Sequence, residues 1–361
     1  MSRVDAPPAG SLESLNIRAF RLGDEPAILD CMRECFGEAP DLAAWRHLHF
    51  ANPAGPPIVW LAWSGQTVVG HVALLPRRIR AFGQEGLAGH SVYAMTRPAW
   101  QRRGVSRTLA AEAWRAARAR GLLAVYGFAN EQSLAGILGY QGRQAVGPLP
   151  VMVRPLRPVG AAARLAYHRL RARPGAGPSG TPVGGLERPP PGWTRSAFDH
   201  RHTALFRGTG SPAPVAVVRD AAYLAWRYRS TPDTPYLQRD VASGKKLAAT
   251  VVLRLARRFG LDLAFVMEWS GPPEWHGPTI DALRHAIALG RDAGVHGVAA
   301  LARRGSPERR MLRRLGFLGV PETLLPGTVC LTVRPAPELE LDGRWHAPAG
   351  WYLTWGDGLL L

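Results

Sequence analysis

Residues 96–106 read Thr96-Arg97-Pro98-Ala99-Trp100-Gln101-Arg102-Arg103-Gly104-Val105-Ser106. The apolar pattern predicts a strand over 87–96 before this stretch and a helix from about Gly104 to Arg120, closed by Gly121, after it. A helix that begins at a glycine presents unpaired backbone N–H groups and the positive end of its dipole to its surroundings. Such a start is suited to bind an anion, and Arg102 and Arg103 add positive charge to it.

Strands and helices are predicted on both sides of this stretch. Before it, the pattern predicts a strand at 15–20, a helix at 24–36 with Asp24 as N-cap, and a hairpin of 58–63 and 67–75 around Ser64-Gly65. After it come a short strand at 122–127 and a helix that Asn130 caps and that ends near Gly139. This order indicates an α/β (α+β) domain.

The second half of the chain repeats landmarks of the first half. Helical segments between two glycines occur at 104–121 and again at 277–294, with the same length. Two further pairs of matching segments are Ala44-Trp45-Arg46-His47 with Ala225-Trp226-Arg227-Tyr228, and Leu138-Gly139-Tyr140 with Leu315-Gly316-Phe317. Three matches in the same order predict an internal duplication. We interpret the repeated Trp-Arg pair at a helix end as a packing anchor. Position alone suggests that His47 lines an acceptor cleft.

The chain divides into three expected regions. A length of 361 residues exceeds one typical domain of about 100–200 residues. We expect a first domain at 1–154, a basic linker at 155–192 and a second domain with a C-terminal tail at 193–361. The linker is assigned because 174–191 is rich in Pro, Gly and Ser and has no means of packing a core. A basic helix is expected at 161–173.

The segment that starts at Gln101 resembles the pyrophosphate loop of the GNAT superfamily of acetyltransferases, whose pattern is Gln/Arg-x-x-Gly-x-Gly/Ala at the start of a helix. Gln101, Gly104 and Ser106 fill its three positions, and Ser106 departs from the usual residue but is also small. The resemblance covers 15–140, and the second copy only as fold. It implies two tandem GNAT-like domains, each with a mixed, mostly antiparallel sheet flanked by helices.

The resemblance also implies acetyl-CoA as co-substrate, with no metal, and assigns residues to bind it. The diphosphate would be bound by the loop and the first helical turn, which comprise Gln101, Arg102, Arg103, Gly104, Val105, Ser106 and Arg107. In the family, the preceding strand splays from its neighbour and pairs with pantetheine, which by position implies Ala94, Met95 and Thr96. Asn130 and Ser133 match positions that often contact the coenzyme, although helix capping explains both equally well.

The second copy departs from this pattern. Its loop reads Glu274-Trp275-His276-Gly277-Pro278. The Glu274 carboxylate would repel a diphosphate, and Pro278 lacks an amide hydrogen that the diphosphate needs. We therefore expect a degenerate copy without coenzyme, which shapes the acceptor pocket or covers the first domain.

The resemblance suggests candidates for acid–base chemistry. His90 lies eleven residues before Gln101, where histone-type relatives carry a catalytic glutamate. An imidazole titrates near neutrality, and the alternative is a strand histidine satisfied by a hydrogen bond. Strand alternation places Tyr93 on the opposite face.

The general acid is left open. Many relatives carry a tyrosine seven residues after the asparagine, and this position is Ile137 here. Tyr140 or water could replace it, although Tyr140 also fits a core aromatic. Because the terminal carboxylate reaches the active site in certain relatives, Leu361 is a further candidate base.

Composition excludes several classes of protein. With 46% hydrophobic and 20% charged residues, the chain is a folded globular protein rather than a disordered one. Its net charge is +18, but all but two of its 45 Lys and Arg residues are arginine, which suggests coding bias more than a nucleic-acid footprint. Part of this charge is expected to steer polyanionic coenzyme A. Neither an apolar run of membrane length nor a signal-peptide layout occurs, so we expect a cytoplasmic protein without a membrane span.

Cysteine chemistry is not expected to contribute. Cys31, Cys35 and Cys330 are the three cysteines, and an odd count agrees with reduced thiols. Cys31 and Cys35 have helical spacing and could hold half a metal site, but no nearby His or Cys completes it. Buried small apolar residues are the expected interpretation.

The leading functional hypothesis is N-acetyl or short N-acyl transfer to a primary amine of a small molecule, an amino sugar, an amino acid or a peptide-like metabolite. A second hypothesis is aminoacyl transfer from tRNA by a ligase with paired GNAT-like domains, but such ligases generally lack the Gln-x-x-Gly loop. A third is a non-catalytic basic protein that binds nucleic acid, for which the sequence has no recognised motif. The identity of the amine and the oligomeric state stay open.

Overall fold

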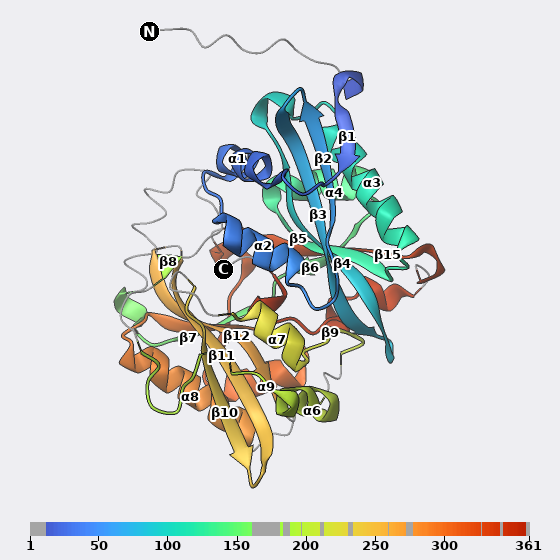
Figure 1. Cartoon of the computed structure of the whole chain (residues 1–361). Coiled ribbons are helices and arrows are strands. Elements are labelled where there is room, and N and C mark those ends of the chain that lie inside the picture. Colours follow the sequence, from blue (N-terminus) through green and yellow to red (C-terminus); the bar gives the residue numbers. More distant parts are fainter. Residues whose placement is uncertain are drawn as a thin grey trace, which may run out of the picture.

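The computed structural model describes residues 12–160, 181–182, 188–195, 197–209, 213–229, 234–258, 260–271, 277–325, 327–339 and 342–358. The expected basic helix at 161–173, most of the linker, Leu361 and the residues Glu274, Trp275 and His276 lie outside this part. Two mixed sheets lie one above the other in Figure 1, and helices flank both. The expected fold class, two α/β units with mixed sheets, is confirmed.

The first sheet has eight strands in the order β1-β2-β3-β4-β5-β15-β6, with β9 also paired to β3. Its strands are β1 (Asn16–Ala19), β2 (Ile58–Ser64), β3 (Thr67–Ala81), β4 (Gln84–Thr96), β5 (Ala124–Asn130), β6 (Gln144–Pro148), β9 (Val215–Val217) and β15 (Val329–Pro335). Every described pair is antiparallel except β4 with β5, which is parallel. A parallel pair needs a crossover connection, and α3 provides it.

The second sheet has seven strands in the order β10-β11-β12-β13-β7-β14, with β8 also paired to β11. Its strands are β7 (Val151–Pro155), β8 (Thr181–Pro182), β10 (Leu237–Ser243), β11 (Lys246–Arg258), β12 (Leu261–Ser270), β13 (Gly297–Leu301) and β14 (Leu318–Gly319). Here too one described pair, β12 with β13, is parallel. The sheets therefore share their pattern of strand directions, as an internal duplication predicts.

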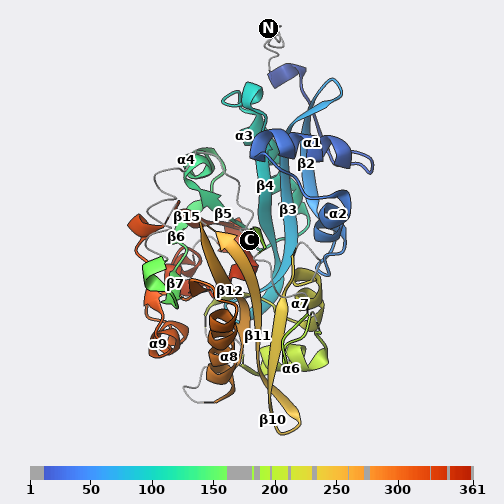
Figure 2. The ribbon, with the colours of Figure 1, turned by 90° about the vertical axis from the view of Figure 1, so that its left-hand side faces the viewer.

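Each half of the sequence contributes strands to the sheet of the other half (Figure 1 and Figure 2), and β9 is one of them because it pairs with β3 of the first sheet. β7 follows the first sheet's strands in the sequence, yet it pairs with β13 and β14 of the second sheet. β15, near the end of the chain, pairs with β5 and β6 of the first sheet. β7 and β15 occupy equivalent positions in the two sheets: each lies next to the second strand of the parallel pair, β13 for β7 and β5 for β15. The domain boundaries expected at 154 and 193 stay a prediction.

Eight α-helices of the described residues flank the sheets. They are α1 (Glu25–Phe36), α2 (Leu42–Phe50), α3 (Val105–Ala119), α4 (Glu131–Tyr140), α6 (His200–Thr209), α7 (Ala221–Arg227), α8 (Pro278–Asp292) and α9 (Pro307–Arg314). Short 3₁₀ helices are η1 (Leu12–Ser14), η2 (Pro98–Trp100), η3 (Glu322–Leu324), η4 (Pro337–Leu339), η5 (Gly343–Trp345), η6 (Pro348–Gly350) and η7 (Trp355–Asp357). None of the described helices is long and apolar enough to cross a membrane.

Apolar clusters lie on both faces of the first sheet. Val72, Leu109 and Val125 belong to the cluster between the sheet and α3. Trp45 and Leu61 belong to the cluster on the other face, against α1 and α2. A third and larger cluster joins the two sheets and contains aromatic side chains of both, which leaves the region between them largely buried.

Candidate active site

The loop between β4 and α3 ends in left-handed backbone. Arg102 has φ of 59° and Gly104 has φ of 84°. Gly104 is the N-cap of α3 and supplies no side-chain hydrogen bond to the helix. The side chain of Gln101 donates to the Thr96 carbonyl over 3.1 Å and braces the loop. Residues 101–104 are all exposed, and binding of an anion by the first amides of α3 stays a prediction.

Aromatic side chains support the arginines of this loop. The Arg103 guanidinium lies 5.5 Å from the centre of the Trp100 ring. The Arg107 guanidinium lies 5.9 Å from the Tyr140 ring, and the Tyr140 hydroxyl donates to Ser106 Oγ over 3.0 Å. These contacts connect the start of α3 with the end of α4. Tyr140 is 38% exposed, so the alternative of a core aromatic is wrong.

Asn130 and Ser133 form the cap of α4. The Asn130 side chain accepts from the Ser133 amide over 2.9 Å and lies 2.8 Å from Ser133 Oγ. Helix capping therefore accounts for both residues. Both are also exposed, and contact with a coenzyme stays a prediction for them.

β4 and β5 separate from one another beside the loop. Their pairing ends at Ser91 with Gly127. Beyond this point β4 continues along β3 as far as Thr96, and β5 continues along β15 as far as Asn130. We call the separation beyond Ser91 and Gly127 the fork. In Figure 1 the fork strands, α3 and α4 meet in the upper half of the molecule.

A β-bulge shapes the β4 side of the fork. Tyr93 has φ of 49°, and the register of β4 on β3 shifts between His71 and Ala73. Tyr93 packs against the apolar cluster beside α1 and α2, which also contains Leu75. Leu75 lies directly opposite His90 in the β3–β4 register, so both side chains are on the same face of the sheet. The expectation that Tyr93 lies on the face opposite to His90 is therefore wrong, because the bulge interrupts strand alternation.

The three residues expected to pair with pantetheine lie beyond this bulge. Ala94 is exposed and Met95 is buried. Thr96 Oγ1 is buried and has no hydrogen-bond partner among the described residues. Their strand borders the fork, so its geometry allows the expected pairing.

His90 lies buried at the base of the fork and is 2% exposed. Its ring stacks on Tyr126 at 5.0 Å and contacts Phe128 edge-on at 5.6 Å. In the described part of the chain, Nδ1 has no hydrogen-bond partner. Burial, followed by the nearby charges of three arginines, lowers the pKa of His90 well below its usual value. The imidazole is therefore neutral at physiological pH.

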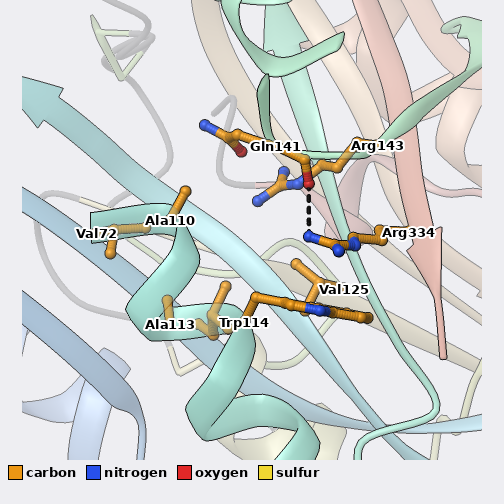
Figure 3. Close-up of a pocket in the computed structure, with 9 residues that line it drawn as sticks. Val72, Ala110, Ala113, Trp114, Val125, Gln141, Arg143 and Arg334 are labelled. Carbon is orange, nitrogen blue, oxygen red and sulfur yellow. Dashed lines mark hydrogen bonds between the residues drawn. The ribbon is translucent and has the colours of Figure 1, made fainter. Parts of the chain in front are cut away.

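Arg143 is a site residue that the sequence did not reveal. It lines a pocket between the sheet and α3 together with Trp114, Gln141 and Arg334, which Figure 3 shows. Arg334 donates to the Gln141 carbonyl over 3.0 Å and lies over the Trp114 ring at 4.1 Å. Burial, and then the charge of Arg334, lowers the pKa of Arg143 to about 10. It therefore carries a positive charge at neutral pH.

The Arg143 guanidinium reaches the base of the fork. A Cβ placed on Gly127 would lie 2.9 Å from Arg143 Nη1 and 3.1 Å from the Ser91 carbonyl oxygen. Only glycine therefore leaves room for the guanidinium at this point. In a chain with so many arginines, no local motif could have distinguished Arg143.

The second sheet carries a helix in the place that α3 has in the first. α8 follows β12 and begins at Gly277, which has φ of 113°, with Pro278 in its first turn. Pro278 removes an amide hydrogen from this helix start. The absence of coenzyme binding here stays a prediction.

The cysteines and possible metal ligands form no further site in the described residues. Cys31 and Cys35 lie 4.0 Å apart, Sγ to Sγ, and both are free thiols. The hydrogen bond with Cys35, and then burial, raises the pKa of Cys31. Nowhere in the described ranges do three His, Cys, Asp or Glu side chains gather in a way that could hold a metal ion.

The fold and the loop define a class of acyltransferases. Residues 16–142 match the family described as acetyltransferase (GNAT) domain. The family match over this part of the chain agrees with the resemblance to the GNAT superfamily in the sequence. No curated protein sequence matched the chain.

Solved structures with the same fold extend over both sheets. A GCN5-related N-acetyltransferase from Anabaena variabilis has a TM-score of 0.60 at 10% identity, and the match covers 89% of this chain and 72% of that one. A probable N-acyltransferase from Enterococcus faecalis has a TM-score of 0.57 at 12% identity, with the same coverage. N-myristoyltransferase from Saccharomyces cerevisiae with bound myristoyl-CoA has a TM-score of 0.57 at 11% identity and covers 97% of this chain and 94% of that one. At these identities the likeness shows the fold.

Proposed function

We propose that this protein transfers an acetyl or short acyl group from acyl-CoA directly to a primary amine of a small molecule, an amino sugar, an amino acid or a peptide-like metabolite. The observation that carries the proposal is the start of α3, where the exposed Gly104 provides no side-chain cap to the helix amides. A helix start of this kind binds phosphate oxygens through backbone N–H groups.

The described residues fit acyl-CoA in two ways. Left-handed backbone at Arg102 and Gly104 is a feature of loops whose successive amides form an anion-binding concavity. The free edge of β4 at Ala94 to Thr96 offers backbone groups to an extended pantetheine, as in strand addition. Bound in this way, the coenzyme would supply the activated thioester.

Two residues at the base of the fork supply the chemistry of transfer. The amine must be neutral when it attacks, and neutral His90 accepts its proton. The Arg143 cation is fixed by burial near Gly127, where it stabilises negative charge that develops on the carbonyl oxygen. Tyr140 and Leu361 remain candidates for the remaining proton transfer, and Tyr140 is also placed to support the diphosphate loop through Ser106.

The second domain covers the acceptor side in this proposal. Arg227 of α7 is near enough to His90 to lower its pKa further, and Trp226 packs in the cluster between the sheets. The acceptor would therefore bind between the two sheets, opposite the side from which the coenzyme enters.

Titration with acetyl-CoA tests the proposal. Wild type should bind one equivalent per chain. Gly104→Asp should weaken binding at least about tenfold because a carboxylate repels the diphosphate, whereas Gly104→Asn has the same shape and tolerates left-handed backbone. Gly277→Asp serves as the control in the second copy and should bind normally. Equal affinity of the Gly104→Asp and Gly104→Asn variants would contradict the assigned loop.

A further inference from the structure

Arg77 of β3 is a buried cation between the two sheets. Arg77 is 1% exposed. The guanidinium lies 4.2 Å from the centre of the Trp226 ring and 5.5 Å from the Tyr223 ring. Neither Nη1 nor Nη2 has a hydrogen-bond partner within the described residues. Contact with aromatic faces compensates only part of the cost of burying a guanidinium, so this site lacks an acceptor.

Two hydroxyl groups near Arg77 also have no partner in the part of the chain that the structure describes. The hydroxyls of Tyr126 and Tyr223 are buried and make no hydrogen bond to any described residue. Arg77 is near enough to affect the pKa of both tyrosines. The nearest carboxylates do not serve this site, because Glu268 and Asp357 both bind Arg219, over 2.8 Å and 2.7 Å. The site therefore offers hydrogen-bond donors and a positive charge, which together select an anion.

Arg77 lies on the same face of the sheet as His90. In the β3–β4 register, Arg77 is opposite Ala88 and Leu75 is opposite His90. The fork begins one residue further along, at Ser91. The strand advances about 10 Å from Ala88 to Ser91. An amino acid or a short peptide, together with the Arg77 side chain, is long enough to span this distance.

We propose that Arg77, with the hydroxyls of Tyr126 and Tyr223, binds a carboxylate of the acceptor. The inference rests on the proposed function: the acceptor's amine lies at the fork and its carboxylate lies between the sheets at Arg77. A guanidinium matches a carboxylate through two parallel hydrogen bonds, and the flanking aromatic rings hold it in orientation. The acceptor is then an amino acid or a short peptide with a free carboxylate, and not an amino sugar.

Matched acceptors test this on the wild-type protein. Thiol release from acetyl-CoA is measured with a panel of amino acids and dipeptides, each beside its amide and its decarboxylated amine. We expect kcat/KM for the best acid to exceed that for its amide about 30-fold or more, because an amide leaves the buried guanidinium without an anion. Equal rates for acids and amides would overturn the inference.

Arg77→Met separates recognition from packing. If Arg77 binds the acceptor, this variant should lose the preference for the acid, keep its affinity for acetyl-CoA, and be as stable as wild type or more so, because an unpaired buried charge is removed. Arg77→Lys should keep part of the preference. Retained preference in Arg77→Met, or loss of stability with unchanged preference, would contradict the assignment.

A binding measurement distinguishes this inference from the proposed function. Product-like N-acetyl amino acids should raise the melting temperature of wild type but not of Arg77→Met, and the corresponding N-acetyl amino acid amides should raise neither. Failure of acetyl-CoA to bind would refute the proposed function even if these carboxylates bind. Failure of the carboxylates with intact coenzyme binding would refute the anion site alone.

Discussion

His47 and Trp226 form a reciprocal contact between the two halves of the chain: Trp226 Nε1 donates to the His47 carbonyl over 3.1 Å, and His47 Nε2 lies 3.0 Å from the Trp226 carbonyl. His47 belongs to α2 and Trp226 to α7. Both lie in the repeated Trp-Arg segments, so the duplicated motif makes a contact between its own copies. The same Trp226 ring lies against Arg77, which connects this contact with the proposed acceptor site.

Trp226→Phe should therefore destabilise the protein more than the equivalent change in the first copy. Phenylalanine keeps an aromatic ring but removes the hydrogen bond to His47, which costs about 1 kcal/mol in the free energy of unfolding. Trp45→Phe is the matched control, because Trp45 Nε1 is buried without a partner in the described structure. Denaturant unfolding measures both. Equal destabilisation by the two variants would show that the hydrogen bond contributes nothing.

Gly127→Ala should damage the fork, whereas Gly139→Ala should not. An added Cβ at Gly127 meets Arg143 Nη1 and the Ser91 carbonyl within 3.1 Å, and overpacking of this kind costs about 1–3 kcal/mol. We also expect weaker acetyl-CoA binding, because the strands must shift at the fork. A Cβ at Gly139, in α4, meets nothing within 4 Å and should stabilise the helix by up to about 1 kcal/mol. Calorimetric titration and unfolding of both variants test the pair, and normal coenzyme affinity in Gly127→Ala would separate the fork from the coenzyme.

Much of the first domain could be predicted from local sequence. The stretch at 96–106 gave the correct order of strand, loop and helix, because a glycine between an apolar strand and an amphipathic helix leaves few alternatives. Capping chemistry located α4, whose Asn130 cap forms as expected. At α1, Asp24 is the N-cap residue but makes no capping bond, because its carboxylate binds Arg18 over 2.7 Å instead. A helix boundary is therefore easier to predict than the bonds that form it.

Long-range relationships could not be predicted from a single sequence. The exchange of β7 and β15 depends on which sheet edge is free once both halves have folded, and neither strand's residues specify that choice. The bulge at Tyr93 inserts one position into a regular strand. The Tyr93 side chain therefore lies on the face opposite to the one that strand alternation predicts. Arg77 and Arg143 differ from the other arginines only in their burial among aromatic or charged neighbours, which the local sequence does not encode.

Asp357→Asn should be among the most destabilising single changes in the second domain. Asp357 and Glu268 both pair with Arg219, and all three residues are at most 1% exposed. Asparagine removes a charged acceptor from two buried donors, the Arg219 guanidinium and the Thr354 amide, at a cost of about 3 kcal/mol. Asp342→Asn is the control, because it breaks the exposed pair with Arg344 and should cost less than about 1 kcal/mol. Comparable effects in denaturant unfolding would mean that burial does not strengthen the Arg219 network.

Stability should fall with acid between about pH 6.5 and pH 4 because of three buried histidines. Burial lowers the pKa of His49 to about 3 and of His71 to about 4, and it lowers the pKa of His90 well below its usual value. An unfolded chain binds protons at these imidazoles below about pH 6.5, while the native chain does not.

The unfolded state therefore gains protons first as the pH falls. The contribution of these histidines to the free energy of unfolding is fully present above about pH 6.5 and is lost as the pH falls toward the native pKa values. Each histidine contributes up to about 1.4 kcal/mol per pH unit in this window. His202 acts in the opposite sense, because hydrogen bonds with Asp240 and Asp199 outweigh burial and raise its pKa.

His90→Phe isolates one of these contributions. It preserves an aromatic ring against Tyr126 and removes the imidazole, so the decline in unfolding free energy below pH 6.5 should become shallower by about 1.4 kcal/mol per pH unit. His200→Phe, on the exposed surface of α6, controls for the loss of any histidine. Unfolding free energies at pH 7, 6 and 5 give the slopes. An unchanged slope in His90→Phe would mean that the pKa of this imidazole is the same in the native and the unfolded protein, which would contradict the prediction.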